Sequence, residues 1–557
     1  MTMLTKWGAA LDRSCPLPEY PRPQLRRESF YNLNGVWDYA VTPSGDEPGV
    51  WDGEIVVPFS PEAPLSGAAR GPAKDEYLHY RRGFTLPEGF QKSRVLLHFG
   101  AVDQIAEVFV NGVSAAKHSG GYWPFSADIT SLLREGENIL RVTVRDNADD
   151  PTFACGKQRY KRGGMWYTAQ SGIWQTVWLE SVPEVYVKSL RITPEFDEAR
   201  VRIELETALE SSAAITCDVR AADGSFVAGS WAKGGVCVVP LPGFRAWTPD
   251  DPYLYTLDIT CGEDRVESYF AMRKFSYVEL GGRKVFGLNN APLFHNGLLD
   301  QGYYPDGLLT PPSDEAMVND IETMKRCGFN MLRKHIKIEP LRWYYHCDRL
   351  GMIVWQDIVS GGQPYSFLHV SALPTLGKVD LPDKDAKPYG RSGVLSRARF
   401  RREMADTVRL LYNCPCIALW TVFNEGWGQF DALDMANELK KLDPTRFIDH
   451  ASGWQDQGYE EMKSRHIYFR PVKLKNDGRA LALTEYGGYI LAVDGHRWTD
   501  KVFGYRICRD SAALAHDYEK LMLGQVLPHI RKEGLTAAVY TQITDVEEEL
   551  NGLMTYD

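Results

Sequence analysis

The sequence predicts a multidomain protein of the β plus α/β class, in which two β-sandwiches precede a C-terminal (β/α)8 TIM barrel. Two observations carry this prediction. Up to about residue 280, short stretches of alternating apolar and polar residues are separated by turn residues, as in antiparallel sheets. Beyond that point, segments with the helical period alternate with apolar strands. A chain of 557 residues is also too long for one hydrophobic core, so several domains are expected.

Residues 1–185 are predicted to form a jelly-roll β-sandwich. The stretch "RVLLHFGAVDQIAEVFVNG" contains two apolar runs and ends in Asn111-Gly112, a dipeptide typical of tight hairpins. The stretch "NILRVTVRDN" alternates from Ile139 to Val144. Four tryptophans are candidates for the sandwich core: Trp37, Trp123, Trp166 and Trp174.

Residues 186–280 are predicted to form a smaller, immunoglobulin-like β-sandwich. The segments "ARVRIELETAL" and "YLYTLDIT" alternate, and "AADGSF" supplies a turn. Pro242 and Pro249 indicate loops inside this unit.

Residues 281–557 are predicted to form the TIM barrel. The segment "PPSDEAMVNDIETMKRCG" places Met317, Ile321 and Met324 on one helical face, and Gly328 is expected to end that helix. Helices of this kind separate most of the predicted strands, and repeated βα units in about 250 residues are typical of this barrel. The eight strands are predicted at "PLFHNGLL", "FNMLRKH", "MIVWQD", "IALWTVFNE", "FIDHAS", "HIYFRP", "LALTEYGG" and "AAVYTQITD".

Two glutamates end strands four and seven of this barrel, Glu425 and Glu485. Active sites of TIM barrels lie where the strands end, so both carboxylates should face one mouth. Retaining glycoside hydrolysis needs such a pair, about 5–5.5 Å apart. The acid of the pair must keep its proton, and Trp420 or Trp427 could raise its pKa. A single strand-end glutamate is more often a cap or a surface ion pair, but two at these positions favour catalysis.

The sequence resembles glycoside hydrolase family 2 over nearly its whole length. The stretches "PRPQLRRESFYNLNGVWDYAV" and "GGMWYTAQSGIWQTVWLE" resemble the opening and the end of the family's sugar-binding domain. The order of the three domains is also that of the family. "FNEGWG" resembles the acid/base motif and "TEYGG" the nucleophile motif. The resemblance implies that Glu425 is the acid/base and that Glu485 is the nucleophile. No phosphate loop, nucleotide fingerprint or zinc spacing stands out, and the proposed mechanism needs no organic cofactor.

Other polar residues at the strand ends are candidate substrate contacts. Arg333 could equally be a core ion-pair partner that orients a glutamate, and His335 could be a structural histidine. His450 and His466 are weaker candidates. The predicted substrate-binding residues are Asn424, Asp300, Gln301, Arg333, His335, Asp357, Tyr468 and Trp427.

The glycone is predicted to be a neutral sugar. Family glucuronidases carry an Asn-x-Lys motif, but here Glu549-Leu550-Asn551 stands in its place, and three acidic residues at 547–549 would repel a carboxylate. Family galactosidases usually have Arg-x-Ser-His, whereas this chain has Arg333-Lys334-His335-Ile336. We expect β-galactosidase-like activity first. The alternatives are β-mannosidase, β-glucuronidase, arabinosidase or transglycosylase activity, or a catalytically silent carbohydrate-binding scaffold.

A long loop, residues 360–393, follows the third predicted strand and far exceeds the usual βα connection. Because function concentrates on this face of the barrel, we expect the loop to wall the pocket and favour exo cleavage of a terminal sugar. An oligomer contact is the alternative.

The composition narrows the partners and the compartment. A net charge of −10 with no sustained basic stretch argues against nucleic acid or an anionic membrane as partner. No apolar leader or membrane-length run occurs, and ten cysteines show no disulfide framework, so a cytoplasmic protein with free thiols is expected.

A bound cation is compatible with the family, but no ligand set is evident. Symmetric dimers or tetramers are common among large members, and the oligomeric state is left open. The printed chain ends at "NGLMTYD", soon after the last predicted strand, so we expect a truncated barrel or another mode of closure.

Overall fold

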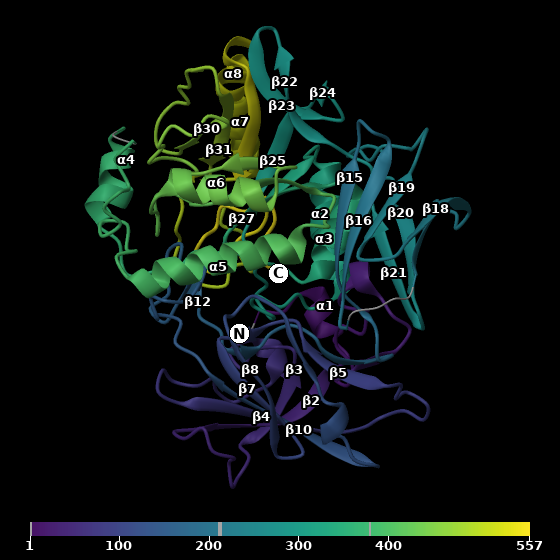
Figure 1. The fold of residues 1–557 in the computed structure, drawn as a ribbon. Helices are drawn as coiled ribbons and strands as arrows, with labels where there is room; N and C mark the ends of the chain where they lie inside the picture. Colours follow the sequence, from purple (N-terminus) through teal and green to yellow (C-terminus); the bar gives the residue numbers. More distant parts are fainter. Residues whose placement is uncertain (1–2, 210–213, 378–379) are drawn as a thin grey trace.

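The N-terminal part forms two antiparallel sheets packed face to face, which confirms the first predicted sandwich (Figure 1). The computed structural model describes residues 3–209, 214–377 and 380–557. One sheet has the order β1 (Phe30–Asn32), β14 (Val177–Val182), β5 (Arg94–Phe99), β9 (Phe125–Asp128). The other has the order β3 (Gly53–Val57), β2 (Gly35–Thr42), β4 (Tyr77–Thr85), β10 (Glu137–Arg145), β7 (Ile105–Val110), β8 (Val113–Ser119). A short helix, α1 (Lys6–Ala9), lies near the N-terminus.

Asn111 and Gly112 connect β7 to β8, and their φ angles are +51° and +82°. Both therefore adopt the left-handed conformation that a tight hairpin turn needs, and the hairpin prediction is confirmed.

The tryptophans predicted for the sandwich core divide into two groups. Trp37 is buried between the sheets of the sandwich, as expected. Trp123 and Trp174 instead belong to the core shared with the barrel, and Trp166 packs against Trp427 of the barrel. The prediction is wrong for these three, because this edge of the sandwich is docked onto the barrel.

The second unit is a sandwich of a three-stranded and a four-stranded antiparallel sheet, as expected of an immunoglobulin-like domain. The three-stranded sheet has the order β15 (Val187–Glu195), β16 (Arg200–Thr207), β19 (Val236–Pro240). The four-stranded sheet has the order β18 (Phe226–Ala232), β17 (Ile215–Arg220), β20 (Tyr255–Cys261), β21 (Asp264–Phe270).

Eight parallel strands form the predicted barrel, which is nearly closed. Their order around the sheet is β29 (Phe447–Asp449), β28 (Ile417–Thr421), β27 (Ile353–Asp357), β26 (Met331–Lys334), β25 (His295–Asp300), β34 (Leu535–Thr541), β31 (Ala480–Gly487), β30 (Met462–Ile467). Among the described residues the end strands β29 and β30 share no hydrogen-bonded ladder, which leaves a seam.

Helices cover the outside of the barrel, as the helical periodicity predicted (Figure 1). On the first of them Met317, Ile321 and Met324 are buried, and Gly328 follows its end with φ of +89°. In the described part of the chain no helix connects β29 to β30 or β30 to β31. The helices are α2 (Asp314–Arg326), α3 (Leu341–Leu350), α5 (Val394–Leu411), α6 (Ala432–Leu442), α7 (Ser511–Leu521) and α8 (Leu527–Glu533).

A small sheet closes the end of the barrel where the strands begin. Phe286 of this sheet packs against Trp355 and Phe447, at centroid distances of 5.8 and 4.4 Å. The sheet comprises β22 (Phe275–Leu280), β23 (Arg283–Leu288) and β24 (Ala291–Pro292). It spans the predicted boundary at residue 280, and the boundaries at 185 and 280 stay predictions.

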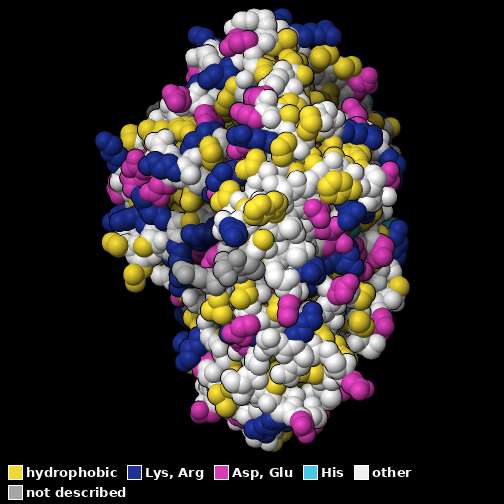
Figure 2. Space-filling view, turned by 45° about the vertical axis from the view of Figure 1, so that its right-hand side comes forward, with side chains coloured by type: hydrophobic (Ala, Val, Ile, Leu, Met, Phe, Trp, Pro, Cys, Tyr) yellow, Lys and Arg dark blue, Asp and Glu magenta, His cyan; other side chains and the backbone are white. Residues whose placement is uncertain are grey.

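The surface carries mixed charge. On the face drawn in Figure 2, basic and acidic side chains are intermingled rather than gathered into one patch of a single sign. None of the helices within the described ranges is long and apolar enough to cross a membrane. None of the ten cysteines, all of which lie in the described ranges, forms a disulfide, and eight of them are buried.

Arg27 ties the N-terminal segment to both sandwiches. Its guanidinium donates to both carboxylate oxygens of Asp264 at 2.9 Å, to Glu180 at 3.0 Å and to the Val187 carbonyl oxygen. The side chain is only 4% exposed, so its charge depends on these partners.

Replacing Arg27 by Met should leave the buried Asp264 carboxylate without its cation, while Glu180 keeps Arg22 at 2.8 Å. We expect the free energy of unfolding to fall by about 3–5 kcal/mol, measured as the urea midpoint by tryptophan fluorescence. Arg26→Met is the matched control, because Arg26 pairs with Glu267 at the surface, where both side chains are more than half exposed. That change should cost less than about 1 kcal/mol. Equal shifts in the two variants would contradict the assignment.

Candidate active site

The candidate active site is a cavity at the carboxyl ends of the barrel strands. The long loop contributes Tyr365, Val370 and Ser371 to its wall, which confirms that part of the prediction; residues 378–379 of that loop lie outside the described part. Further along, the loop contains the short helix α4 (Leu373–Thr375). From the barrel come Leu299, His335, Ile336, Asn424, Glu425, Trp427, Tyr468, Glu485, Tyr505, Thr541 and Glu549, and from the first sandwich Lys157, Met165 and Trp166.

Glu425 follows β28 in a left-handed backbone conformation, with φ of +53°. A residue other than glycine pays about 1–3 kcal/mol for such a conformation, so the surroundings must hold it. Its amide donates to the Ser452 carbonyl oxygen at 2.9 Å, and its own carbonyl accepts from Trp454 Nε1 at 2.7 Å. These bonds fix where the carboxylate points.

Glu485 lies within β31, and both of its carboxylate oxygens are hydrogen-bonded. Oε1 accepts from Arg333 Nη1 at 3.0 Å, and Oε2 accepts from the Tyr468 hydroxyl. Tyr468 in turn stacks on Tyr505 with ring centroids 3.8 Å apart. Glu485 is therefore anchored on both sides, with only 5% of its surface exposed.

Arg333 is fully buried beneath the cavity floor rather than facing the cavity. Besides Glu485, it donates to both carboxylate oxygens of Asp357 at 3.0 Å and to Asn424 Oδ1 at 2.8 Å. Of the two interpretations of Arg333, this geometry favours the ion-pair partner that orients a glutamate.

His466, a weak candidate from the sequence, lies between the two glutamates. Its Nδ1 is 2.8 Å from Glu425 Oε1, and its Nε2 is 3.6 Å from Glu485 Oε1. One ligand-type atom from each of the three residues lies within 4.8 Å of the others. Among the described residues they are the group whose side chains could hold a metal ion. The Arg333 guanidinium beside Glu485 opposes a second cation there.

The electrostatics differ between the two glutamates. Burial raises the pKa of Glu425 to about 7, while Lys157 and Arg333 oppose that rise. Burial also raises the pKa of Glu485, opposed by His466 and Arg333. Burial lowers the pKa of His466 to about 4, so its imidazole is neutral near pH 7. Glu425 can thus hold a proton near neutral pH, as an acid catalyst must.

Several predicted substrate contacts do line the cavity. They are Asn424, His335, Tyr468 and Trp427. Burial lowers the pKa of His335 to about 3, so this histidine is neutral. Trp420, the other proposed neighbour of the acid, lies outside the lining, and its Nε1 donates to Asp443 at 3.0 Å.

Besides Arg333, three predicted contacts do not line the cavity: Asp357, Asp300 and Gln301. Asp357 lies beneath it, where its carboxylate binds Arg333 and His335. Asp300 pairs with Lys334 at 2.7 Å, and the amide of Gln301 donates to Gln542 at 2.8 Å. Their carboxylate and amide groups bind other side chains of the barrel, so a position at a strand end did not by itself identify a substrate contact.

Sequence patterns did not identify Lys157 or Trp166 as cavity residues, whereas Glu549 was considered for the charge that it would bring to the site. Lys157 and Trp166 enter the cavity from the sandwich, and Glu549 enters from the segment after β34. Of the three acidic residues at 547–549, only Glu549 lines the cavity, because Glu547 and Glu548 bind backbone amides of the sandwich. These contacts depend on how the domains dock, which no local sequence pattern reveals.

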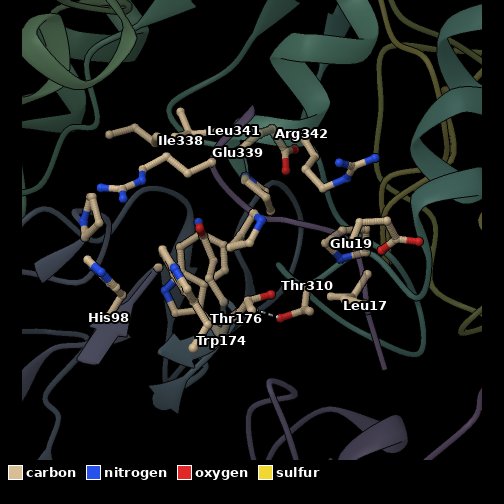
Figure 3. Close-up of a pocket in the computed structure, with 18 of the residues that line it drawn as sticks. Leu17, Glu19, His98, Trp174, Thr176, Thr310, Ile338, Glu339, Leu341 and Arg342 are labelled. Carbon is tan, nitrogen blue, oxygen red and sulfur yellow. Dashed lines mark hydrogen bonds between the residues drawn. The ribbon is translucent and has the colours of Figure 1, made fainter. Parts of the chain in front are cut away.

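A second cavity of about 180 Å³ lies between the first sandwich and the barrel and shares no residue with the catalytic lining (Figure 3). His98 and Trp174 come from the sandwich, and Ile338 and Leu341 from the barrel. Because it contains neither glutamate, it is not the candidate active site.

One carboxylate oxygen of Glu425 and one of Glu485 lie within 4.8 Å of each other at the strand ends of a parallel barrel, and glycosidases of the retaining type use a close pair of carboxylates. Models of one protein family match three segments of the chain, in the order of the three domains described above. Residues 64–183 match the sugar binding domain of glycosyl hydrolases family 2, residues 185–273 match glycosyl hydrolases family 2, and residues 311–474 match the family's TIM barrel domain. The chain belongs to glycoside hydrolase family 2.

The relatives of this chain are named for two different activities, β-galactosidase and β-glucuronidase. A β-galactosidase of Thermoanaerobacter pseudethanolicus is 25% identical over 66% of this chain and 47% of its own length. A β-glucuronidase of Paenibacillus borealis is 22% identical over 85% of each chain. The chain spans about half the length of the β-galactosidases it matches. The solved β-glucuronidase of an uncultured Clostridium sp. shares the fold, with a TM-score of 0.73, 19% identity and 96% coverage of both chains.

The raised pKa of Glu425 has a consequence for stability. Its folded value of about 7 exceeds the ordinary 4.5, so between these pH values the folded chain binds more protons than the unfolded chain. The ionised carboxylate therefore destabilises the fold above about pH 7, and this effect vanishes below about pH 4.5. Glu425→Gln should raise the free energy of unfolding by about 2–3 kcal/mol near pH 8 and leave it unchanged near pH 4.

Chemical denaturation at the two pH values measures this difference. Glu460→Gln, at an exposed glutamate, is the control and should show no pH-dependent change. A Glu425→Gln effect of equal size at both pH values would contradict the raised pKa.

Proposed function

We propose that this protein is an exo-acting retaining β-glycosidase that hydrolyses a terminal sugar through a covalent glycosyl-enzyme. The observation that carries the proposal is the close approach of Glu425 and Glu485, whose carboxylate oxygens lie at most 4.8 Å apart. Inverting enzymes need about 6.5–9.5 Å between the two groups to admit a water molecule, so this spacing favours retention.

In the first step the Glu485 carboxylate attacks the anomeric carbon, and the bond from that carbon to the leaving oxygen breaks. Glu425 gives its proton to the leaving oxygen. Arg333 and Tyr468 hold Glu485 on both oxygens, which fixes the direction of attack. A pKa of about 7 keeps a proton on Glu425 for this step near neutral pH.

In the second step water attacks the anomeric carbon of the glycosyl-enzyme. Glu425, now ionised, takes a proton from that water, and the bond to Glu485 breaks to restore its carboxylate. An alcohol in place of water would give transglycosylation by the same chemistry. The cavity is walled by the sandwich and by the long loop, which suits the binding of one terminal sugar.

For the sugar we propose a β-galactoside. Glu549 lines the cavity, and the negative charge of its carboxylate would repel a uronic acid. Curated relatives of this chain include β-galactosidases.

A β-glucuronide is the second candidate, and one observation favours it. Lys157 lines the cavity, and its ammonium group lies over the Tyr167 ring at 5.5 Å and forms no salt bridge among the described residues. A lysine in this position could bind the carboxylate of a uronic acid. Curated relatives also include β-glucuronidases.

Glu485→Gln should lower the turnover of aryl β-glycosides by at least about 10³-fold, because it removes the nucleophile. Initial rates with aryl galactosides measure the loss, and NMR of the first-formed sugar anomer should show retention in the wild-type enzyme. Glu403→Gln is the matched control, since Glu403 is equally buried but lies outside the cavity. Sugar binding without turnover in the wild-type protein would support a silent scaffold instead.

Lys157→Met separates the two sugars. We expect the wild type to prefer the aryl β-galactoside to the β-glucuronide, and the variant to keep galactoside kcat/KM within about threefold. If the wild type instead prefers the glucuronide, and the variant loses at least about tenfold on it alone, the second candidate is right. The comparison uses kcat/KM for both substrates in both proteins.

A further inference from the structure

A larger cavity adjoins the catalytic cavity on the side of the molecular surface. We call it the outer cavity; its volume is about 420 Å³, and the first sandwich and the long loop form most of its lining. Three aromatic residues line both cavities: Trp166, Tyr365 and Trp427. The two cavities therefore adjoin each other at these side chains.

The outer cavity lies on the side of Glu425 rather than Glu485. Trp427 is two residues beyond Glu425 in the chain, and burial together with the charge of Glu425 raises the pKa of Tyr365 to about 12. On the far side, Glu485 is flanked by Tyr468 and Tyr505, neither of which lines the outer cavity. In the proposed reaction Glu425 protonates the leaving oxygen, so the leaving group must lie next to it.

The shared wall is aromatic. Trp166 packs edge-on against Trp427 with centroids 5.1 Å apart, and Tyr365 adds a third ring. The Arg159 guanidinium lies 4.4 Å from the Trp166 ring and 5.2 Å from the Trp427 ring. Flat apolar groups bind well against such rings.

The outer cavity also carries an excess of positive charge. Arg159 and Lys161 both line it, against a single acid, Asp149. In the described ranges neither cation is paired with a carboxylate, and Arg159 donates instead to the Gln158 carbonyl oxygen and Cys155 Sγ. A cation that is not neutralised by the protein can attract an anion on a ligand.

We propose that the outer cavity is the subsite for the leaving group and that it selects aryl aglycones bearing a carboxylate or another anionic substituent. The ring packs against Trp166 and Trp427, and the anion lies near Arg159 and Lys161. This inference rests on the proposed glycosidase function, because only then does a leaving group depart beside Glu425.

The test compares two substrates with the same sugar, the 4-carboxyphenyl and the neutral 4-carboxamidophenyl glycoside. The ratio of kcat/KM between them is measured in the wild type and in variants, so that the intrinsic difference between the leaving groups cancels. Arg159→Met should lower the carboxylate-to-carboxamide ratio about five- to tenfold, and Lys161→Met about two- to threefold. Both effects should shrink at high salt.

Lys92→Met is the matched control, because Lys92 is an exposed lysine of the same sandwich outside both cavities. Lys161 is exposed, so its variant keeps the test valid if Arg159→Met folds poorly. An unchanged ratio in both variants, with turnover of the carboxamide intact, would overturn the subsite while leaving the glycosidase function standing. Absence of turnover for every glycoside in the wild type would overturn the function and this inference with it.

Discussion

A single buried guanidinium, that of Arg333, is the constraint on which the catalytic geometry depends. A fully buried charge must be neutralised and hydrogen-bonded, and Arg333 finds its partners on three other parts of the barrel. It lies on β26, Asp357 on β27, Asn424 after β28 and Glu485 on β31. One side chain therefore fixes the relative positions of the cavity floor, Glu485 and Asn424, which precedes Glu425.

The site is composite, and its second half comes from domain docking. The barrel supplies both carboxylates and the side chains that hold them. The sandwich supplies Lys157 and Trp166, which form part of the cavity wall. Tyr167 and Thr168, directly after Trp166, bind Glu549 and Glu547 of the C-terminal segment. The parts of the sandwich that line the cavity are thus held by the same contacts that join the domains.

Much of the fold followed from local patterns, because strand alternation and helical periodicity are properties of short segments. The eight barrel strands and the strand-end positions of Glu425 and Glu485 are of this kind. Asp300 shows the limit of that reasoning. Its position at a strand end was right, but its carboxylate pairs with Lys334 of the next strand, and sequence does not specify to which side a strand-end side chain turns. Trp174 shows a second limit. A side chain that is buried against another domain has the same sequence pattern as one that is buried inside its own domain.

The seam between β29 and β30 gives the two glutamates unequal mechanical support. Glu485 belongs to β31, which is paired on both sides, with β30 and β34. Glu425 is instead held through Ser452 and His466, which stand on opposite sides of the seam. Local unfolding starts where the hydrogen-bond network is least continuous. In the proposed reaction, proton transfer to the leaving group should therefore fail on warming before nucleophilic attack does, and substrates whose leaving group needs no proton should remain active to higher temperature.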